Sequence, residues 1–251
     1  MNDYLGIQLR DLPYFRALIR GVEAVYYQTF NLPEPTLDVG CGDGHFASLV
    51  FERKIDVGVD PWTGPIHEAK GRNCYKMLVQ ADGAHSPFPA EFFASAFSNS
   101  VLEHIPHIDA VLGDTARVLK RQAPFYFCVP NQRYFSELSI SRLLGKGYTE
   151  WFRRISRVEH ADGPEIWKER LELAGFQLDR WWHYFSPSAM RMLEWGHYFG
   201  LPSLFTRKLT GKWVLVAARW NLWLTDNIVR RYFSSEPIDD GTFTFFIARK
   251  K

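Results

Sequence analysis

Three glycines at alternate positions, flanked by acidic residues, form the segment of this sequence best suited to bind a ligand. Gly40, Gly42 and Gly44 follow the apolar run Thr36–Val39, and a helix is expected to open after them. Glycines at such a turn allow a tight bend and let a ligand lie against bare main chain at a helix N-terminus. The alternative is a glycine-rich turn that holds no ligand.

The charges around this loop indicate which ligand it suits. Asp38 and Asp43 flank the loop, and His45 stands where a dinucleotide-binding G-x-G-x-x-G loop has its last glycine. Carboxylates repel a pyrophosphate, but they attract a ligand that carries an ammonium and a sulfonium group. The loop therefore favours S-adenosylmethionine (SAM) over a nicotinamide dinucleotide.

Two further acids follow later strand candidates. Asp60 ends the run VGVD, 22 residues after Asp38, where a carboxylate can accept both ribose hydroxyls of an adenosine. Asp82, next to Gly83, follows the third strand candidate and can reach an adenine amino group. A single acid at a strand end commonly just caps a helix. Three of them after successive strands, together with the glycine loop, indicate an adenosine ligand.

Apolar runs that alternate with helical patterns position these residues. Strands are expected at 36–39, 55–59, 76–80, 94–98, 125–129, 176–185 and 242–248. Helices are expected at 13–29, 44–53, 65–70, 107–120 and 164–174. This order predicts an α/β layer fold with a mainly parallel sheet.

Several segments resemble class I SAM-dependent methyltransferases, and the type 11 methyltransferase family most of all. They are LDVGCGDGHFA, VGVD, VQADGAHSPFPAEFFASAFSNSVLEHI and RVLKRQAPFYFCVPN. The similarity covers about residues 34–131 strongly, and 164–185 with 242–249 more loosely. It implies a Rossmann-like sheet of seven strands, mainly parallel with an antiparallel last strand and with helices on both faces. A single domain over residues 1–251 is expected, with a helical insertion at about 186–235 before the last strand. Gly83, where the family often has alanine, and the length of the insertion depart from the family pattern.

The resemblance also implies roles for individual residues. Asp38 with the loop residues Gly40, Cys41, Gly42 and Gly44 would hold the methionine end of SAM, and Asp60 would bind the ribose. Asp82 and Gly83 would meet the adenine, while Ser98 and Asn99 would line the floor beneath the sulfonium. The product would be S-adenosylhomocysteine.

Methyl transfer from a sulfonium is a direct displacement, so a general base is needed only for some acceptors. Glu103 and His104 follow the fourth strand, and His104 is the candidate to take a proton from a hydroxyl. The alternative is that His104 caps a helix or closes over the cofactor. No metal is expected, because the proline between His104 and His107 breaks the geometry of a ligand pair.

Candidates for the acceptor pocket follow the fifth strand. They are Tyr134, Arg153, Arg157, His160 and His183. The arginines near Trp151 suit a phosphate or carboxylate on the acceptor. The alternative for such a cluster is a solvated helix face.

The insertion is basic and rich in tryptophan. Between residues 186 and 235 there are seven basic and two acidic residues, a net charge of +5, and four tryptophans. The run WVLVAARWNLWL at 213–224 predicts a helix with Trp213, Val216, Trp220, Trp223 and Leu224 on one face. Three roles remain open for it: a lid on the body, a homodimer interface, or a peripheral contact with a membrane surface.

Composition limits the remaining classes of function. The 251 residues carry a net charge of +2, too little to indicate nucleic-acid binding, and 46% of them are hydrophobic. The three cysteines lack metal-site spacing, and the N-terminus does not resemble a signal peptide. A cytoplasmic protein is expected, with a peripheral position at the inner membrane face as the variant.

The sequence therefore predicts methyl transfer from SAM to an oxygen or nitrogen of a small-molecule or lipid-linked, glycan-type acceptor. The main alternative is a SAM-binding regulatory or scaffold protein without turnover. A nicotinamide-dependent oxidoreductase is the second alternative, which the loop acids disfavour.

Overall fold

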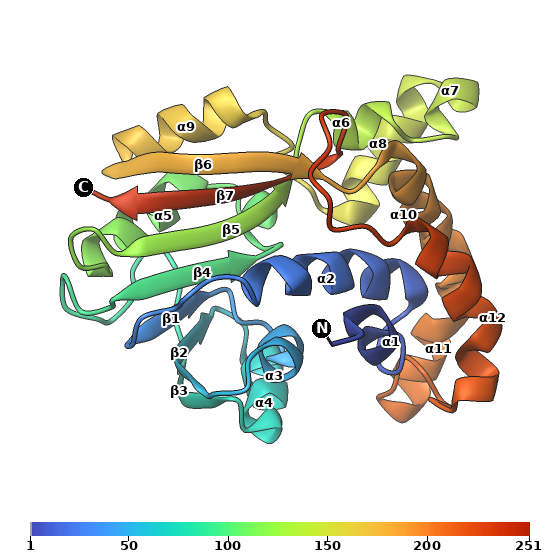
Figure 1. Cartoon of the computed structure of the whole chain (residues 1–251), viewed down its shortest axis with the longest axis horizontal. Coiled ribbons are helices and arrows are strands. Elements are labelled where there is room, and N and C mark those ends of the chain that lie inside the picture. The colour runs from blue at the N-terminus through green and yellow to red at the C-terminus, as the bar shows by residue number, and fades with distance from the viewer. Residues whose placement is uncertain (1) are drawn as a thin grey trace.

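A seven-stranded sheet forms the centre of the molecule in the computed structural model, which describes residues 2–251 (Figure 1). The strand order is β3-β2-β1-β4-β5-β7-β6, and only β7 runs antiparallel to its neighbours. The strands are β1 Thr36–Val39, β2 Ile55–Asp60, β3 Tyr75–Gln80, β4 Ser95–Asn99, β5 Pro124–Pro130, β6 Phe176–Tyr184 and β7 Phe243–Lys250. The predicted mainly parallel sheet with an antiparallel last strand is confirmed.

Helices cover both faces of this sheet. The body contains α1 Tyr4–Gln8, α2 Tyr14–Tyr27, α3 His45–Val50, α4 Thr63–Arg72, α5 Ile108–Val118 and α9 Pro164–Leu173. Beyond β5 the chain adds α6 Arg133–Ser136, α7 Ser141–Leu144, α8 Lys146–Ser156, α10 Pro187–Phe199, α11 Leu201–Thr210 and α12 Arg219–Val229. Short 3-10 helices span Leu102–His104 and Arg230–Tyr232. The last three α-helices lie within the predicted insertion, at the end of the molecule to which the parallel strands point (Figure 1).

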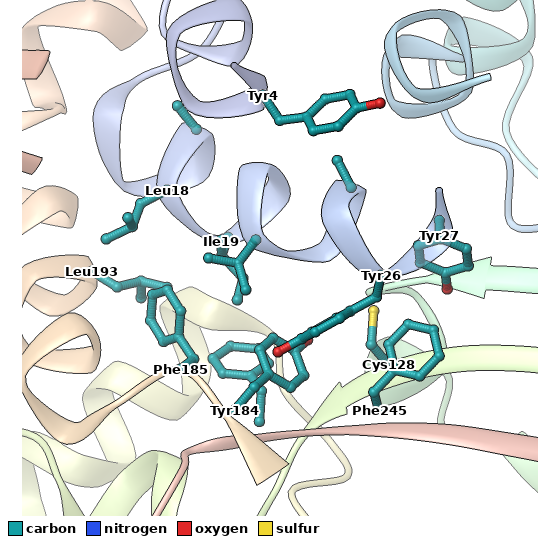
Figure 2. Packing of buried hydrophobic residues seen from close by; sticks show 14 of the residues in the cluster. Tyr4, Leu18, Ile19, Tyr26, Tyr27, Cys128, Tyr184, Phe185, Leu193 and Phe245 are labelled. Atoms are coloured by element: carbon teal, nitrogen blue, oxygen red, sulfur yellow. The ribbon is translucent and has the colours of Figure 1, made fainter. Parts of the chain in front are cut away.

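The alternation of side chains along the strands divides the core into two layers. In β5, Phe125, Phe127 and Val129 pack with α5 and α9, whereas Tyr126 and Cys128 face the layer under α2. Both layers are rich in aromatic rings. Figure 2 shows α2 lying over this second layer, which contains Tyr26, Tyr184 and Phe245. The aromatic rings thus fix α2 across the sheet.

A buried carboxylate fastens the insertion to the segment that follows β5. Glu194 of α10 is fully buried and accepts hydrogen bonds from the backbone N–H groups of Ser139, at 2.6 Å, and Ile140, at 3.2 Å. A buried carboxylate needs such donors to offset the loss of hydration. They hold α10 in place.

The predicted continuous helix over residues 213–224 is wrong. Helix α11 ends at Thr210, Gly211 follows in the left-handed region with φ of 75°, and α12 begins only at Arg219. A left-handed glycine ends a helix, and the β-branched Val214 and Val216 disfavour a restart. Trp213 therefore lies in a loop and does not share a helix face with the tryptophans of α12.

No helix within residues 2–251 is both long enough and apolar enough to cross a membrane.

Candidate functional site

The glycine loop folds back on the ends of β1 and β2. Gly40, Gly42 and Gly44 have φ values of 77°, 53° and 70°, all in the left-handed region. A Cβ on Gly40 would lie 2.4 Å from Val101 Cγ1, so Gly40 is required by both its conformation and its neighbour. A Cβ on Gly42 would meet nothing within 4 Å, which leaves this stretch of main chain open to a ligand.

Asp60 braces the loop. Its Oδ2 accepts a hydrogen bond from Gly42 N at 3.0 Å, and its Oδ1 accepts one from Trp62 N at 2.9 Å. Burial raises the pKa of Asp60, and these two backbone donors oppose the rise. Each carboxylate oxygen keeps a second lone pair, so Asp60 can hold the loop and still accept bonds from a diol.

Asp38 lies buried in β1 beside this loop. Its Oδ2 accepts a 2.7 Å hydrogen bond from the hydroxyl of Tyr75. Burial raises the pKa of Asp38 to about 7; the bond from Tyr75 and the charge of Arg20 oppose this, while Asp60 adds to it. A cationic ligand group at Asp38 would favour its ionised form.

Around the loop lies a cavity of about 290 Å³, here called the glycine-loop cavity. Among the predicted cofactor residues it is lined by Asp38, Gly40, Cys41, Gly42 and Asn99. Gly44 does not line it, since this residue caps α3. The amide oxygen Oδ1 of Asn99 is buried there and has no hydrogen-bond partner among residues 2–251.

Four other predicted cofactor residues, Asp60, Asp82, Gly83 and Ser98, are not among the residues that line the cavity. Asp82 is exposed two residues beyond β3, where its carboxylate accepts a bond from Ala84 N, and Gly83 follows it. Ser98 is fully buried in the sheet, and its hydroxyl donates to the carbonyl of Val39 at 2.8 Å. Asp82 remains beside Asp60, because Ala81 N donates to the Asp60 carbonyl, whereas Ser98 serves the packing of β1 against β4.

A second, larger cavity of about 690 Å³, the aromatic cavity, lies between α2, α8, α10 and α11. Most of its wall is apolar, and the insertion supplies much of it. Examples are Phe15, Trp151, Leu193, Tyr198, Leu204 and Phe243. A cavity of this size with few polar groups suits a largely apolar small molecule.

Three side chains line both cavities: Arg16, Arg20 and Trp213. Arg20 Nη1 donates to the carbonyl of Asn99 at 2.7 Å, which seats α2 over the end of β4. The ring of Trp213 has the guanidinium of Arg16 at 5.6 Å and that of Arg207 at 5.0 Å from its centroid. The sequence prediction missed all three residues, although the i, i+4 spacing of Arg16 and Arg20 placed them on one helix face.

Glu103 is a buried acid in the wall of the aromatic cavity. Its side chain is 4% exposed, and its Oε2 has no hydrogen-bond partner in the part of the chain that the structure describes. Burial raises the pKa of Glu103, with the charge of His104 opposing the rise. An unpartnered buried carboxyl is costly, and a bound hydroxyl or amine could supply the missing donor.

His104, the predicted base, lines the same cavity. Its Nδ1 lies 2.8 Å from the carbonyl of Arg157, so Nδ1 carries a proton and donates it there. Its Nε2 lies 3.8 Å from Glu103 Oε1. The two side chains therefore lie next to each other at the cavity wall.

A network of polar groups fixes the turn that carries this pair. Ser100, directly after β4, has φ of 49° although it is not glycine, and its hydroxyl donates to Glu23 Oε1 at 2.8 Å. Asn99 Nδ2 donates to Glu23 Oε2 at 2.7 Å. Glu23 lies fully buried on α2, so the strained turn is held by a helix far away in the sequence.

Of the five predicted acceptor residues, only Tyr134 lines the aromatic cavity. Arg153 stacks over the ring of Phe135 at 4.1 Å, and Arg157 ends α8 in the left-handed region. His160 Nε2 lies 3.0 Å from the carbonyl of Ile105, and His183 Nδ1 lies 2.7 Å from Thr244 Oγ1. None of these four side chains lines the cavity, and Arg153, His160 and His183 have partners elsewhere.

Among residues 2–251, no group of three or more histidine, cysteine, aspartate or glutamate side chains is arranged to hold a metal ion.

Comparison with known proteins agrees with this geometry. A family model described as a methyltransferase domain, of type 11, matches residues 37–127, which contain the glycine loop and strands β1 to β4. Two trans-aconitate 2-methyltransferases of Rhodopseudomonas palustris, from strains BisB5 and HaA2, are 22% and 24% identical over 184 residues. Each alignment covers 67% of this chain and 69% of the relative.

Solved structures share the fold at low sequence identity. A SAM-dependent methyltransferase of Thermotoga maritima, described as a possible histamine N-methyltransferase, is 16% identical with a TM-score of 0.57, covering 93% of this chain and 92% of its own. The cyclase SpnF is 18% identical with a TM-score of 0.58, covering 94% of this chain and 82% of its own. Since a cyclase shares the fold, the fold alone does not define the reaction. The matched domain is more specific than the fold: residues 37–127 of this chain match a methyltransferase domain of type 11, which is a domain of class I SAM-dependent methyltransferases.

Proposed function

We propose that this protein transfers the methyl group of SAM to a hydroxyl oxygen or amine nitrogen of a small-molecule or lipid-linked acceptor held in the aromatic cavity. One observation carries the proposal. The glycine-loop cavity and the aromatic cavity adjoin, with Arg16, Arg20 and Trp213 lining both. A donor in one and an acceptor in the other would meet at these side chains, as a displacement requires.

The glycine-loop cavity fits the charges of SAM. The pKa of Asp38 is raised to about 7, and a nearby ammonium group would stabilise its ionised form. The same ammonium group would supply the hydrogen-bond donor that Asn99 Oδ1 lacks among the described residues. The side chain of Arg16 forms no hydrogen bond or ion pair within the described part of the chain, so its guanidinium is available to a carboxylate. Asp60 would hold the ribose, and Asp82 beside it the adenine.

SAM supplies an electrophilic methyl group on a sulfonium. The residues of this chain hold the acceptor, exclude water and manage one proton. The aromatic walls and Trp213 would exclude water once both ligands are bound, which would strengthen electrostatic interactions between them. The apolar lining orients the acceptor through its hydrocarbon part.

Glu103 and His104 would remove the proton that a hydroxyl or ammonium acceptor must lose. A carboxyl group with a raised pKa is a stronger base, closer to the operating pH. We assign the base to Glu103 and the support of its charge to His104, because His104 is held by the Arg157 carbonyl and lies 3.8 Å from Glu103 Oε1.

Calorimetry with SAM and a mass-spectrometric screen test this function. The protein is expected to bind SAM and to release S-adenosylhomocysteine with apolar alcohols or amines, which gain 14 mass units (roughly one methylene). If SAM does not bind, the proposed function fails. SAM binding without turnover on any fraction of a lysate, membranes included, would favour the regulatory alternative.

The affinity for SAM is expected to fall with acid. An ammonium group binds the ionised form of Asp38, so affinity should rise as the pH passes about 7 and level off above it. About tenfold weaker binding is expected at about pH 6 than at about pH 8, since a carboxyl one unit below its pKa is roughly one-tenth ionised. Calorimetry across this range measures the change. Asp38→Asn should bind weakly with a flat profile, and a flat profile in the wild type would contradict the assignment.

A further inference from the structure

The outward side of α11 is apolar and largely exposed. No residue of α11 is buried, and Leu204, Phe205 and Leu209 are 50%, 70% and 84% exposed. Their spacing places these side chains along one strip of the helix. Contacts with the body stabilise such an exposed helix only a little, apart from the ion pair between Arg207 and Glu68 of α4 at 3.0 Å.

Helix α12 repeats the pattern with tryptophans. Trp220, Trp223 and Leu224 are 77%, 66% and 61% exposed, and only Val229 of this helix is buried. Figure 1 shows both helices at the same end of the molecule, outside the sheet and its covering helices. We call the outward apolar sides of α11 and α12, with the cations between them, the insertion surface.

The charge of this surface has one sign. No acidic residue occurs between Glu194 and Asp226. Within the part of the chain that the structure describes, Lys208, Lys212 and Arg219 form no ion pairs. Exposed tryptophans next to unpaired cations are typical of proteins that rest in the headgroup region of a bilayer.

The inner edge of the insertion surface is also the rim of the aromatic cavity. Leu201 and Leu204 of α11 both line the cavity and are about half exposed, as are Trp151 and Ile155 of α8. The apolar wall of the cavity thus continues outward as an apolar surface. A hydrocarbon chain could pass from one to the other without crossing a polar rim.

We propose that the insertion surface docks on an anionic phospholipid bilayer, with the mouth of the aromatic cavity at the edge of the docked area. Charge selects this occupant over a second copy of the chain. A symmetric dimer through this surface would bring the unpaired Lys208, Lys212 and Arg219 of one copy against the same cations of the other, whereas anionic headgroups neutralise them. Docking goes beyond the methyl transfer proposed above, and its test does not require turnover.

Co-sedimentation with vesicles tests the docking. The wild type is expected to bind vesicles of phosphatidylcholine mixed with phosphatidylglycerol, to bind pure phosphatidylcholine weakly, and to lose binding at high salt. Trp220→Ser/Trp223→Ser should weaken binding about tenfold or more through lost apolar burial. Lys208→Glu/Arg219→Glu should weaken it about tenfold or more through charge.

Matched controls use exposed residues of the body. Ile166→Ser/Leu173→Ser on α9 removes two exposed apolar side chains, 46% and 83% exposed, and should leave vesicle binding unchanged. Arg121→Glu/Lys168→Glu repeats the charge reversal away from the insertion and should have less effect than its counterpart. Absence of wild-type binding, equal losses in test and control variants, or a dimer in sedimentation velocity that Trp220→Ser/Trp223→Ser dissociates would overturn the proposal. Calorimetric SAM binding by all variants keeps this result separate from the proposed function.

Discussion

Glu103→Gln is expected to lower kcat roughly 100- to 10,000-fold, the range that removal of a general base produces. Glutamine keeps the shape of the side chain but cannot take a proton. SAM binding should be unchanged, because Glu103 lines the aromatic cavity and not the glycine-loop cavity. Release of S-adenosylhomocysteine at saturating SAM measures the effect once an acceptor is known, and calorimetry measures SAM affinity.

The pH profile separates a base from a merely structural acid. Burial raises the pKa of Glu103 above its ordinary value of 4.5, so activity should fall as the pH drops through that raised value. In His104→Gln, which keeps Glu103, the opposing charge of the histidine is lost, so the acid limb should move to higher pH with a smaller loss of kcat. Equal activity of Glu103→Gln and wild type, with both folded, would refute the assignment of the base.

Asp60→Ala is expected to weaken SAM binding about 100-fold or more. The substitution removes the acceptor of two backbone hydrogen bonds, from Gly42 and Trp62, as well as the proposed partner of the ribose. Hydrogen bonds to a charged group contribute roughly 1.5–3 kcal/mol each, so loss of two leaves the glycine loop poorly held. Calorimetry of the variant against the wild type measures the loss.

Asp56→Ala provides the control on the same strand. Asp56 accepts from Thr36 N at 2.8 Å and pairs with Lys76 at 2.7 Å, at the end of β2 away from the loop. It should reduce the free energy of unfolding but not the affinity of the folded protein for SAM. If Asp60→Ala and Asp56→Ala bind SAM equally well, Asp60 has no role in the cofactor site.

Local patterns predicted most strands and helices of the body to within two residues, whereas helix α3 ends three residues earlier than expected and the short helix α1 is absent from the prediction. Strand β1 has the expected bounds, and β5 extends the expected 125–129 by one residue at each end. Apolar and polar side chains alternate along these strands, or the strands are apolar on both faces, and glycines or polar turns end them. The residues of each strand and its flanks are therefore enough to predict its bounds. The helix expected over 213–224 failed because Gly211 and the contacts of Trp213 with two arginines outweigh its apolar composition.

In the candidate site, too, residues within short sequence motifs could be predicted, and residues brought in by long-range packing could not. Asp38 and the glycine loop belong to one short motif, Asp60 ends the next strand, and the structure brings them together through the bond from Gly42 N to Asp60. Arg16 and Arg20 come from a helix before β1, and which strand ends that helix covers is decided by long-range aromatic packing. His160 and His183 were expected in the acceptor pocket because histidine can bind ligands and transfer protons. Their contacts with the Ile105 carbonyl and the Thr244 hydroxyl hold them outside the aromatic cavity.

Trp213 lines both cavities, so binding of a ligand in one cavity can affect binding of a ligand in the other. Because the ring of Trp213 lines both the glycine-loop cavity and the aromatic cavity, a ligand that shifts this ring in one cavity changes the volume of the other. Occupancy of the two cavities is then thermodynamically linked, and the linkage is reciprocal: the factor by which one ligand changes the affinity of the other is the same in both directions. Trp213 is thus placed to couple the binding of one substrate to the binding of the other.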